Sequence, residues 1–178
     1  MQLKAIVDSS GDPMPLTDLG QVRNMELPAG WCCGRQEEER YSLREFNPPG
    51  GNPLARLTFY YRGVELDKES GRRFQEILNE PPHLLSAGEI RRVGQVLRQQ
   101  ADPRSFCVQA VWTASLNGRT ILLTSGHWLL YDQSAYALYI DACGTGRTVQ
   151  EIYFTAPPVE YCRHIADVLK ALYSIQWK

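Results

Sequence analysis

Several features that would point to a particular function are missing from this sequence of 178 residues. Its longest wholly apolar runs are only a few residues, far short of the roughly 20 that a membrane-spanning helix needs. The N-terminal residues 1–8 form too short and too polar a stretch for a secretion signal. We therefore expect a soluble, cytoplasmic protein that does not insert into membranes.

An excess of one charge is also missing. Lys and Arg number 19 against 20 for Asp and Glu, which gives a net charge of −1 and no strong global field. Binding of single-stranded nucleic acid also requires exposed aromatic side chains for stacking, and most aromatic residues here alternate toward the expected core. Nucleic acid is therefore not an expected partner.

The cysteines and histidines lack the spacing of a metal site. The five cysteines, at positions 32, 33, 107, 143 and 162, contain no Cys-x-x-Cys pair. Four of them adjoin apolar strand or helix positions, so we expect reduced thiols that pack as small hydrophobic side chains, with one of the adjacent pair Cys32-Cys33 facing solvent. The three histidines are scattered along the chain, and we expect no metal and no cofactor.

The strongest pattern that is present lies in residues 105–155, which predict four consecutive β-strands. Asn117-Gly118, the sharpest turn signal in the chain, joins the first two. Alternation places one apolar set on one face of the first strand: Phe106, Val108, Ala110, Trp112, Ala114 and Leu116. A C-terminal helix is expected to cover this face with a stripe formed by Cys162, Ile165, Leu169 and Leu172, with Val168 and Ile175 beside it.

The remaining segments predict strands followed by helices. Residues 1–20 are a poorly patterned N-terminal segment in which Gln2–Val7 is a candidate short strand, and residues 21–178 are expected to form a single domain. The elements expected within it are a strand at 55–62, a helix capped by Asp67 and ending near Asn79, a helix from the Ser86–Glu89 capping box to about Gln99, and a last helix opened by Pro157-Pro158. Short turns between the late strands make them antiparallel, so the expected class is α+β, with an antiparallel β-sheet packed against helices as an α/β/α sandwich.

Three groups of residues have the composition of a catalytic or phosphate site. Cys33 or Cys143 could act as a nucleophile with His127 or His164 as base, but nothing in the spacing favours this over buried structural thiols. Ser125-Gly126-His127 with Asp132 has the residue types of a hydrolase triad, and Gly126 is better explained by a bulge or a close backbone contact.

Cys143-Gly-Thr-Gly-Arg147 resembles a phosphate cradle in composition alone. It joins two strands where a phosphate loop would open a helix, so we interpret it as a hairpin turn. No catalytic residue is therefore assigned.

The expected middle helices carry Arg72-Arg73, Arg91-Arg92 and Arg98. They could form a basic patch for an acidic partner. Glu69, Glu76 and Glu89 interleave with them, and we favour a solvated helix face that these carboxylates neutralise.

The order of elements resembles a known superfamily. The residues that carry the resemblance are Leu27-Pro-x-Gly-Trp31, Val111-Trp112-Thr113, Asn117-Gly118-Arg119 and Tyr153-Phe-Thr-Ala-Pro157. Together, over residues 22–177, they look like the Mog/PsbP-like superfamily. The resemblance implies an antiparallel sheet between helices and a protein that binds other proteins without catalysis.

We therefore expect a non-enzymatic protein-binding or adaptor module, of the kind found among bacterial secretion-associated chaperones, effectors and immunity proteins. Its expected contact surface is a rim formed by loops 47–53 and 144–147 with nearby aromatic residues. The candidate binding residues are Trp31, Tyr60, Arg91, Arg92, Trp128 and Arg147. The alternative is a cysteine-dependent enzyme or a small-ligand-binding protein.

Overall fold

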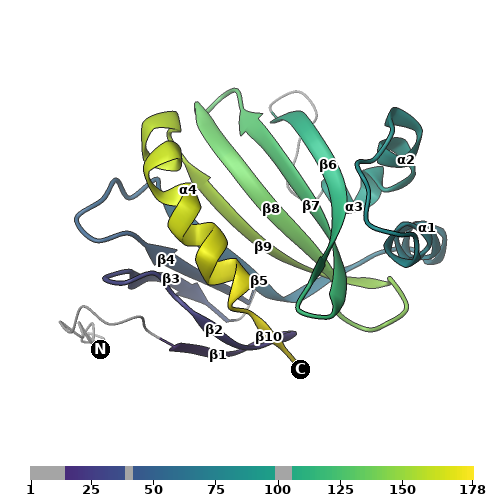
Figure 1. The fold of residues 1–178 in the computed structure, drawn as a ribbon, viewed down its shortest axis with the longest axis horizontal. Helices are drawn as coiled ribbons and strands as arrows, with labels where there is room; N and C mark the ends of the chain where they lie inside the picture. The colour runs from purple at the N-terminus through teal and green to yellow at the C-terminus, as the bar shows by residue number, and fades with distance from the viewer. Residues whose placement is uncertain (1–14, 39–41, 99–105) are drawn as a thin grey trace.

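The chain forms two antiparallel sheets and four helices in the computed structural model, which describes residues 15–38, 42–98 and 106–178 (Figure 1). The larger sheet has seven strands in the order β3-β4-β5-β9-β8-β7-β6, and the smaller one has the order β1-β2-β10. The strands are β1 (Pro15–Leu19), β2 (Val22–Glu26), β3 (Cys32–Glu37), β4 (Leu43–Asn47), β5 (Arg56–Glu65), β6 (Phe106–Leu116), β7 (Arg119–Trp128), β8 (Gln133–Asp141), β9 (Thr148–Ala156) and β10 (Gln176–Trp177). The predicted α+β class with an antiparallel sheet is confirmed, and the strands divide into two sheets.

The four late strands are confirmed, as is their first hairpin. Asn117 and Gly118 both have positive φ angles, 48° and 84°, as a tight two-residue hairpin turn requires. The predicted alternation along β6 is wrong in its first half, because the register with β7 shifts between Val108 and Ala110. This bulge leaves Val108 exposed and packs Phe106 against Trp128, while the second half of β6 faces the C-terminal helix as predicted.

Local capping signals fix where the helices begin. Helix α1 (Lys68–Asn79) starts after Asp67, whose side chain accepts hydrogen bonds from two backbone N–H groups, and the predicted boundaries are confirmed. The Ser86–Glu89 capping box is also present. The single helix expected to follow it is wrong: the chain forms α2 (Ala87–Arg92) and α3 (Gly94–Arg98), which are separated at Val93.

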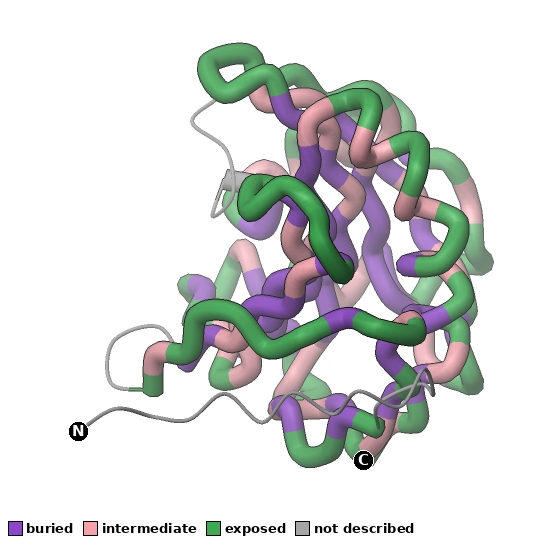
Figure 2. The backbone as a smooth tube through the Cα atoms, turned by 90° about the vertical axis from the view of Figure 1, so that its left-hand side faces the viewer, coloured by how far each residue is buried: buried purple, intermediate pink, exposed green. Residues whose placement is uncertain are grey.

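The C-terminal helix α4 (Pro158–Tyr173) and the helices α1–α3 pack on opposite faces of the large sheet (Figure 1). On β8, Leu138 and Ile140 pack in the cluster that contains α4 and the small sheet, whereas Ala137 and Tyr139 pack with α1–α3. The central strands are therefore buried on both sides. In Figure 2 the buried stretches, in purple, run through the middle of the molecule. Strand β1 lies in a segment expected to be poorly patterned, and the candidate strand at 2–7 lies outside the described residues.

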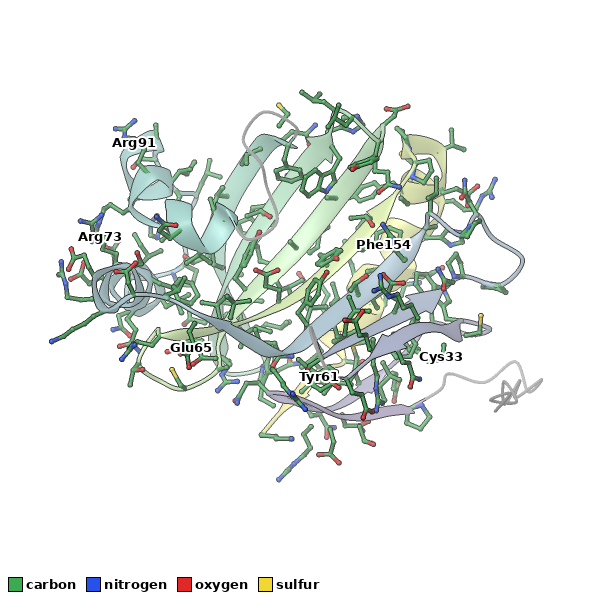
Figure 3. The ribbon with its side chains drawn as sticks, turned by 180° about the vertical axis from the view of Figure 1, so that it is seen from behind. Cys33, Tyr61, Glu65, Arg73, Arg91 and Phe154 are labelled. Carbon is green, nitrogen blue, oxygen red and sulfur yellow. The ribbon has the colours of Figure 1, made fainter. Side chains whose placement is uncertain are left out.

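The two edges of the large sheet differ. Residues 83–85 run along part of β6: the Thr113 N–H donates to His83 O at 2.9 Å, and the Leu85 N–H donates to Val111 O at 2.9 Å. Strand β3 forms the other edge, where nearly every residue is exposed, and Cys33 lies there in Figure 3.

The expectation that four cysteines are packed in the interior is wrong, because all five are free and exposed. Cys32 and Cys33 lie on the edge strand, and Cys107 precedes the bulge of the other edge strand. Cys143 lies in the β8–β9 turn, and Cys162 lies on the outer side of α4. Among the described residues, no helix has both the length and the apolar character needed to span a membrane.

Candidate functional site

Large apolar side chains are exposed at one end of the large sheet. The β7–β8 turn presents Leu129, Leu130 and Tyr131, which are 61%, 75% and 67% exposed. Val159, in the first turn of α4, is 72% exposed. It lies at the same end of the sheet, because α4 follows β9 directly and Ala156 at the end of β9 pairs with Ser134 near the start of β8. We call these four residues the apolar end.

The base of this turn is held in place by regular pairing. Trp128 pairs with Gln133 at the last position of the β7–β8 ladder, and the Trp128 ring packs on Phe106 with ring centroids 4.8 Å apart. His127 Nε2 lies 3.1 Å from Asp132 Oδ1, and this contact bridges the two sides of the turn. A paired and packed base therefore supports residues 129–131, which project away from the core.

Sequence reasoning missed the apolar end. The available signal was the run Trp128-Leu-Leu-Tyr131, in which apolar residues continue through a turn where polar residues normally dominate. Exposed apolar groups gathered in one place on a folded protein mark interaction sites more often than single exposed ones do.

None of the three predicted aromatic residues is fully exposed. Trp31 is only 6% exposed and packs its ring on Phe154 and His164, so it belongs to the core. Tyr60 is half-buried, and its hydroxyl accepts a hydrogen bond of 3.2 Å from Tyr153. Trp128 is half-buried at the base of the apolar end and is the one predicted aromatic residue that adjoins it.

The predicted rim is not brought together. Loop 48–55 precedes β5 at the end of the sheet where β9 finishes, whereas loop 142–147 precedes β9 at its other end. The nine residues of β9 separate them by roughly 27 Å at about 3.4 Å per step. Arg147 accordingly lies far from Trp31 and Trp128, beside a hollow of about 620 Å³ next to α1.

The arginines of α1 and α2 are mostly paired with glutamates. Glu69 contacts Arg72 at 2.7 Å and Arg73 at 2.8 Å, and Glu76 pairs with Arg72 and with Arg92. Hydrogen bonds from Arg72 and then Arg73 lower the pKa of Glu69 to about 2. The predicted neutralised helix face is confirmed for these two glutamates.

Glu89 is different, because its carboxylate is engaged by Ser86 and His83 and not by an arginine. Arg91 makes no ion pair with any of the described residues. Figure 3 shows Arg91 and Arg73 projecting outward from the helices.

All three histidines face carboxylates. His83 contacts Glu89 at 3.0 Å, His127 contacts Asp132 at 3.1 Å and His164 contacts Glu160 at 3.3 Å. Cys143 follows the far end of β8 from His127, so the cysteine–histidine pair that the sequence left as an unfavoured alternative does not form between these two residues.

The backbone N–H groups of the Cys143–Arg147 loop are bound by the carboxylate of Asp141, which precedes the loop. Asp141 Oδ1 accepts the N–H groups of Cys143 at 3.1 Å and Gly144 at 3.0 Å, and Oδ2 accepts that of Gly146 at 2.9 Å. These are the donors that a phosphate would need. The loop is therefore a hairpin turn closed by Asp141, as predicted from the sequence.

A second hollow, of about 390 Å³, lies between α4 and residues 26–31. It is lined in part by Glu26, Leu27, His164, Asp167 and Lys170. Lys170 and Asp167 pair with each other at 3.3 Å, so these two charges neutralise each other beside the hollow.

No family model matches this chain, and neither does any curated protein. The geometry therefore defines the class: an α+β protein with antiparallel sheets and an exposed apolar end on a β-hairpin.

Proposed function

We propose that this protein is a non-enzymatic protein-binding module that contacts its partner through the apolar end. The observation that carries the proposal is the exposure of Leu129, Leu130 and Tyr131 on a turn whose base is fixed. Burying apolar and aromatic side chains is the main source of affinity at the centre of protein interfaces.

The partner that fits this surface is a protein with an apolar cleft. The three side chains project from a narrow hairpin turn, a shape that inserts into a concavity. Asp132, the nearest acidic group in the turn, contacts His127, so charge attraction contributes little. Binding is expected to depend weakly on salt.

The experiment is photo-crosslinking in lysate of the native host, with a benzophenone amino acid at position 130. Proteins linked to the wild-type surface are quantified by mass spectrometry with and without Tyr131→Ser. We expect one dominant linked protein and at least a tenfold loss of it in the variant, because removal of a tyrosine that acts as an interface hot spot weakens binding by about 2 kcal/mol or more.

The chain offers a matched control in Tyr173→Ser, since Tyr173 is 65% exposed against 67% for Tyr131 and lies at the opposite end of α4 from Val159. The control is expected to leave crosslinking unchanged. Equal loss in both variants, or linkage to many proteins at similar levels, would contradict a specific contact at the apolar end. Linkage only to lipid would place this turn on a membrane instead.

We also propose that the layers are those of the Mog/PsbP-like superfamily and that the protein works in a reducing compartment. Helices on both sides of an antiparallel sheet support the first point, and five free exposed thiols support the second. An experimental structure with a different strand order, or disulfides in protein isolated from its host, would contradict them.

A second candidate function is thiol chemistry at Cys143. Partial burial is the largest influence on its pKa and raises it, but hydrogen bonds involving Thr145 and Thr148 together outweigh burial and lower the pKa below 9.0. We expect iodoacetamide to label Cys143 at lower pH than Cys162, as measured by peptide mass spectrometry. Equal labelling profiles would remove this candidate.

A further inference from the structure

Three side chains from consecutive segments converge beside the edge of β6. Glu80 ends α1, His83 lies in the segment that runs along β6, and Glu89 belongs to the first turn of α2. Their ligand atoms lie within 4.8 Å of one another. His83 Nε2 is 3.0 Å from Glu89 Oε1 and 3.7 Å from Glu80 Oε2.

The backbone fixes which nitrogen of His83 carries a proton. Nδ1 lies 2.7 Å from the carbonyl oxygen of Pro81, which can only accept, so Nδ1 is the donor. In the neutral ring, Nε2 then presents a lone pair toward the oxygens of Glu80 and Glu89, which also only accept. This arrangement requires a positive charge between the three groups, and either a proton on Nε2 or a metal ion can supply it.

We propose that Glu80, His83 and Glu89 bind one divalent transition-metal ion, with Zn²⁺ as the best match to one imidazole and two carboxylates. Bonds of about 2.0–2.1 Å in a tetrahedron place ligand atoms about 3.3 Å apart. The separations of His83 Nε2 from the two carboxylate oxygens, 3.0 and 3.7 Å, bracket that value. Glu80 is 43% exposed at its side chain and is free to complete the site, with water in the fourth position.

The surroundings already orient two of these ligands. The Nδ1–H donation from His83 to Pro81 O is the outer contact that metal-binding histidines usually make. The second oxygen of Glu89 accepts from the Ser86 N–H at 2.7 Å and the Ser86 hydroxyl at 2.6 Å, which leaves Oε1 directed at His83. A bound ion would join the end of α1 to the start of α2 across the covered edge of β6.

The test is calorimetric titration of Zn²⁺ into the full chain after its exposed thiols are blocked with iodoacetamide. We expect one ion per chain and at least tenfold weaker binding in His83→Gln and in Glu89→Gln. Glutamine at position 89 keeps the capping box, so the second variant should remain folded. His127→Gln is the control, because His127 faces a single carboxylate.

A proton and Zn²⁺ compete for Nε2, so affinity should fall at acid pH and binding should release protons. Titrations in buffers with different ionisation enthalpies measure that release. Absence of saturable Zn²⁺ binding by the wild type, or equal binding by His83→Gln, would overturn the site and leave a proton as the cation on Nε2. The result is independent of the apolar end, because His83→Gln and Glu89→Gln change neither the residues of that turn nor those at its base.

Discussion

Gly126 lies where β7 passes closest to the bulged part of β6. A Cβ atom at this position would stand 2.4 Å from the Phe106 ring and 2.6 Å from the Cys107 carbonyl oxygen. Gly126→Ala must therefore displace backbone, and overpacking of this kind costs about 1–3 kcal/mol of the free energy of unfolding. Urea unfolding monitored by circular dichroism measures the loss.

Gly94→Ala provides the matched control. A Cβ atom at Gly94 would have no neighbour within 4 Å, and Gly94 opens helix α3, where alanine is preferred by up to about 1 kcal/mol. We expect this variant to be as stable as the wild type or more so. An equal loss in both variants would show that the close contact at Gly126 is not the cause.

Helix α1 carries an acid-sensitive cluster in its first two turns. The pKa of Glu69 falls from its ordinary 4.5 to about 2 because Arg72 and Arg73 donate hydrogen bonds to it. A lowered pKa in the folded state stabilises the protein above pH 4.5, and this contribution is lost as the pH falls toward 2. Glu69→Gln should therefore lower stability near neutral pH and reduce its dependence on pH between 4.5 and 2.

Urea unfolding at several pH values measures both effects. Glu65→Gln is the control, because Glu65 is exposed and makes no ion pair with any described residue. The control should retain the acid dependence of the wild type. If the stability of Glu69→Gln changed with pH in the same way as that of the Glu65→Gln control, the result would contradict a stabilising role for the cluster.

Element boundaries were predictable where a local signal determines them. Asp67 and the Ser86–Glu89 box start helices through their own side chains, and Asn117-Gly118 sets its hairpin without help from distant residues. The bulge in β6 was not predictable from alternation, because a shifted residue depends on the partner strand. Gly126 on the partner strand β7 was a signal in the sequence that indicated the bulge.

The candidate site was harder to predict, since exposure depends on the order of strands in the sheet. One of Cys32 and Cys33 was expected to pack inside, but both are exposed because β3 forms an edge. Trp31, one residue earlier, was expected at the surface and is buried beneath α4. Neither outcome can be read from the residues themselves, because both depend on pairings between distant segments.

At the scale of the whole molecule, the C-terminus joins the two sheets. Trp177 pairs with Val22 in the small sheet, and its Nε1–H donates to Leu116 O of the large sheet at 2.7 Å. The Arg119 guanidinium lies over the same ring, 5.4 Å from its centroid. The Asn117 side chain donates to the carbonyl oxygen of Tyr173, the last residue of α4, and to that of Ile175 just beyond it, which fixes the approach of the chain to β10.

We therefore expect Trp177→Ala to lower the free energy of unfolding by about 2–4 kcal/mol, because it removes both a packed ring and a hydrogen bond between the sheets. Trp177→Phe keeps a ring and should lose only about 1 kcal/mol. Hydrogen exchange should show faster exchange in β1 and β2 of the alanine variant, with β8 little changed, because the small sheet is held by fewer strands. Unchanged protection of β1 and β2 would mean that their packing under α4, and not the C-terminal strand, joins the small sheet to the rest of the protein.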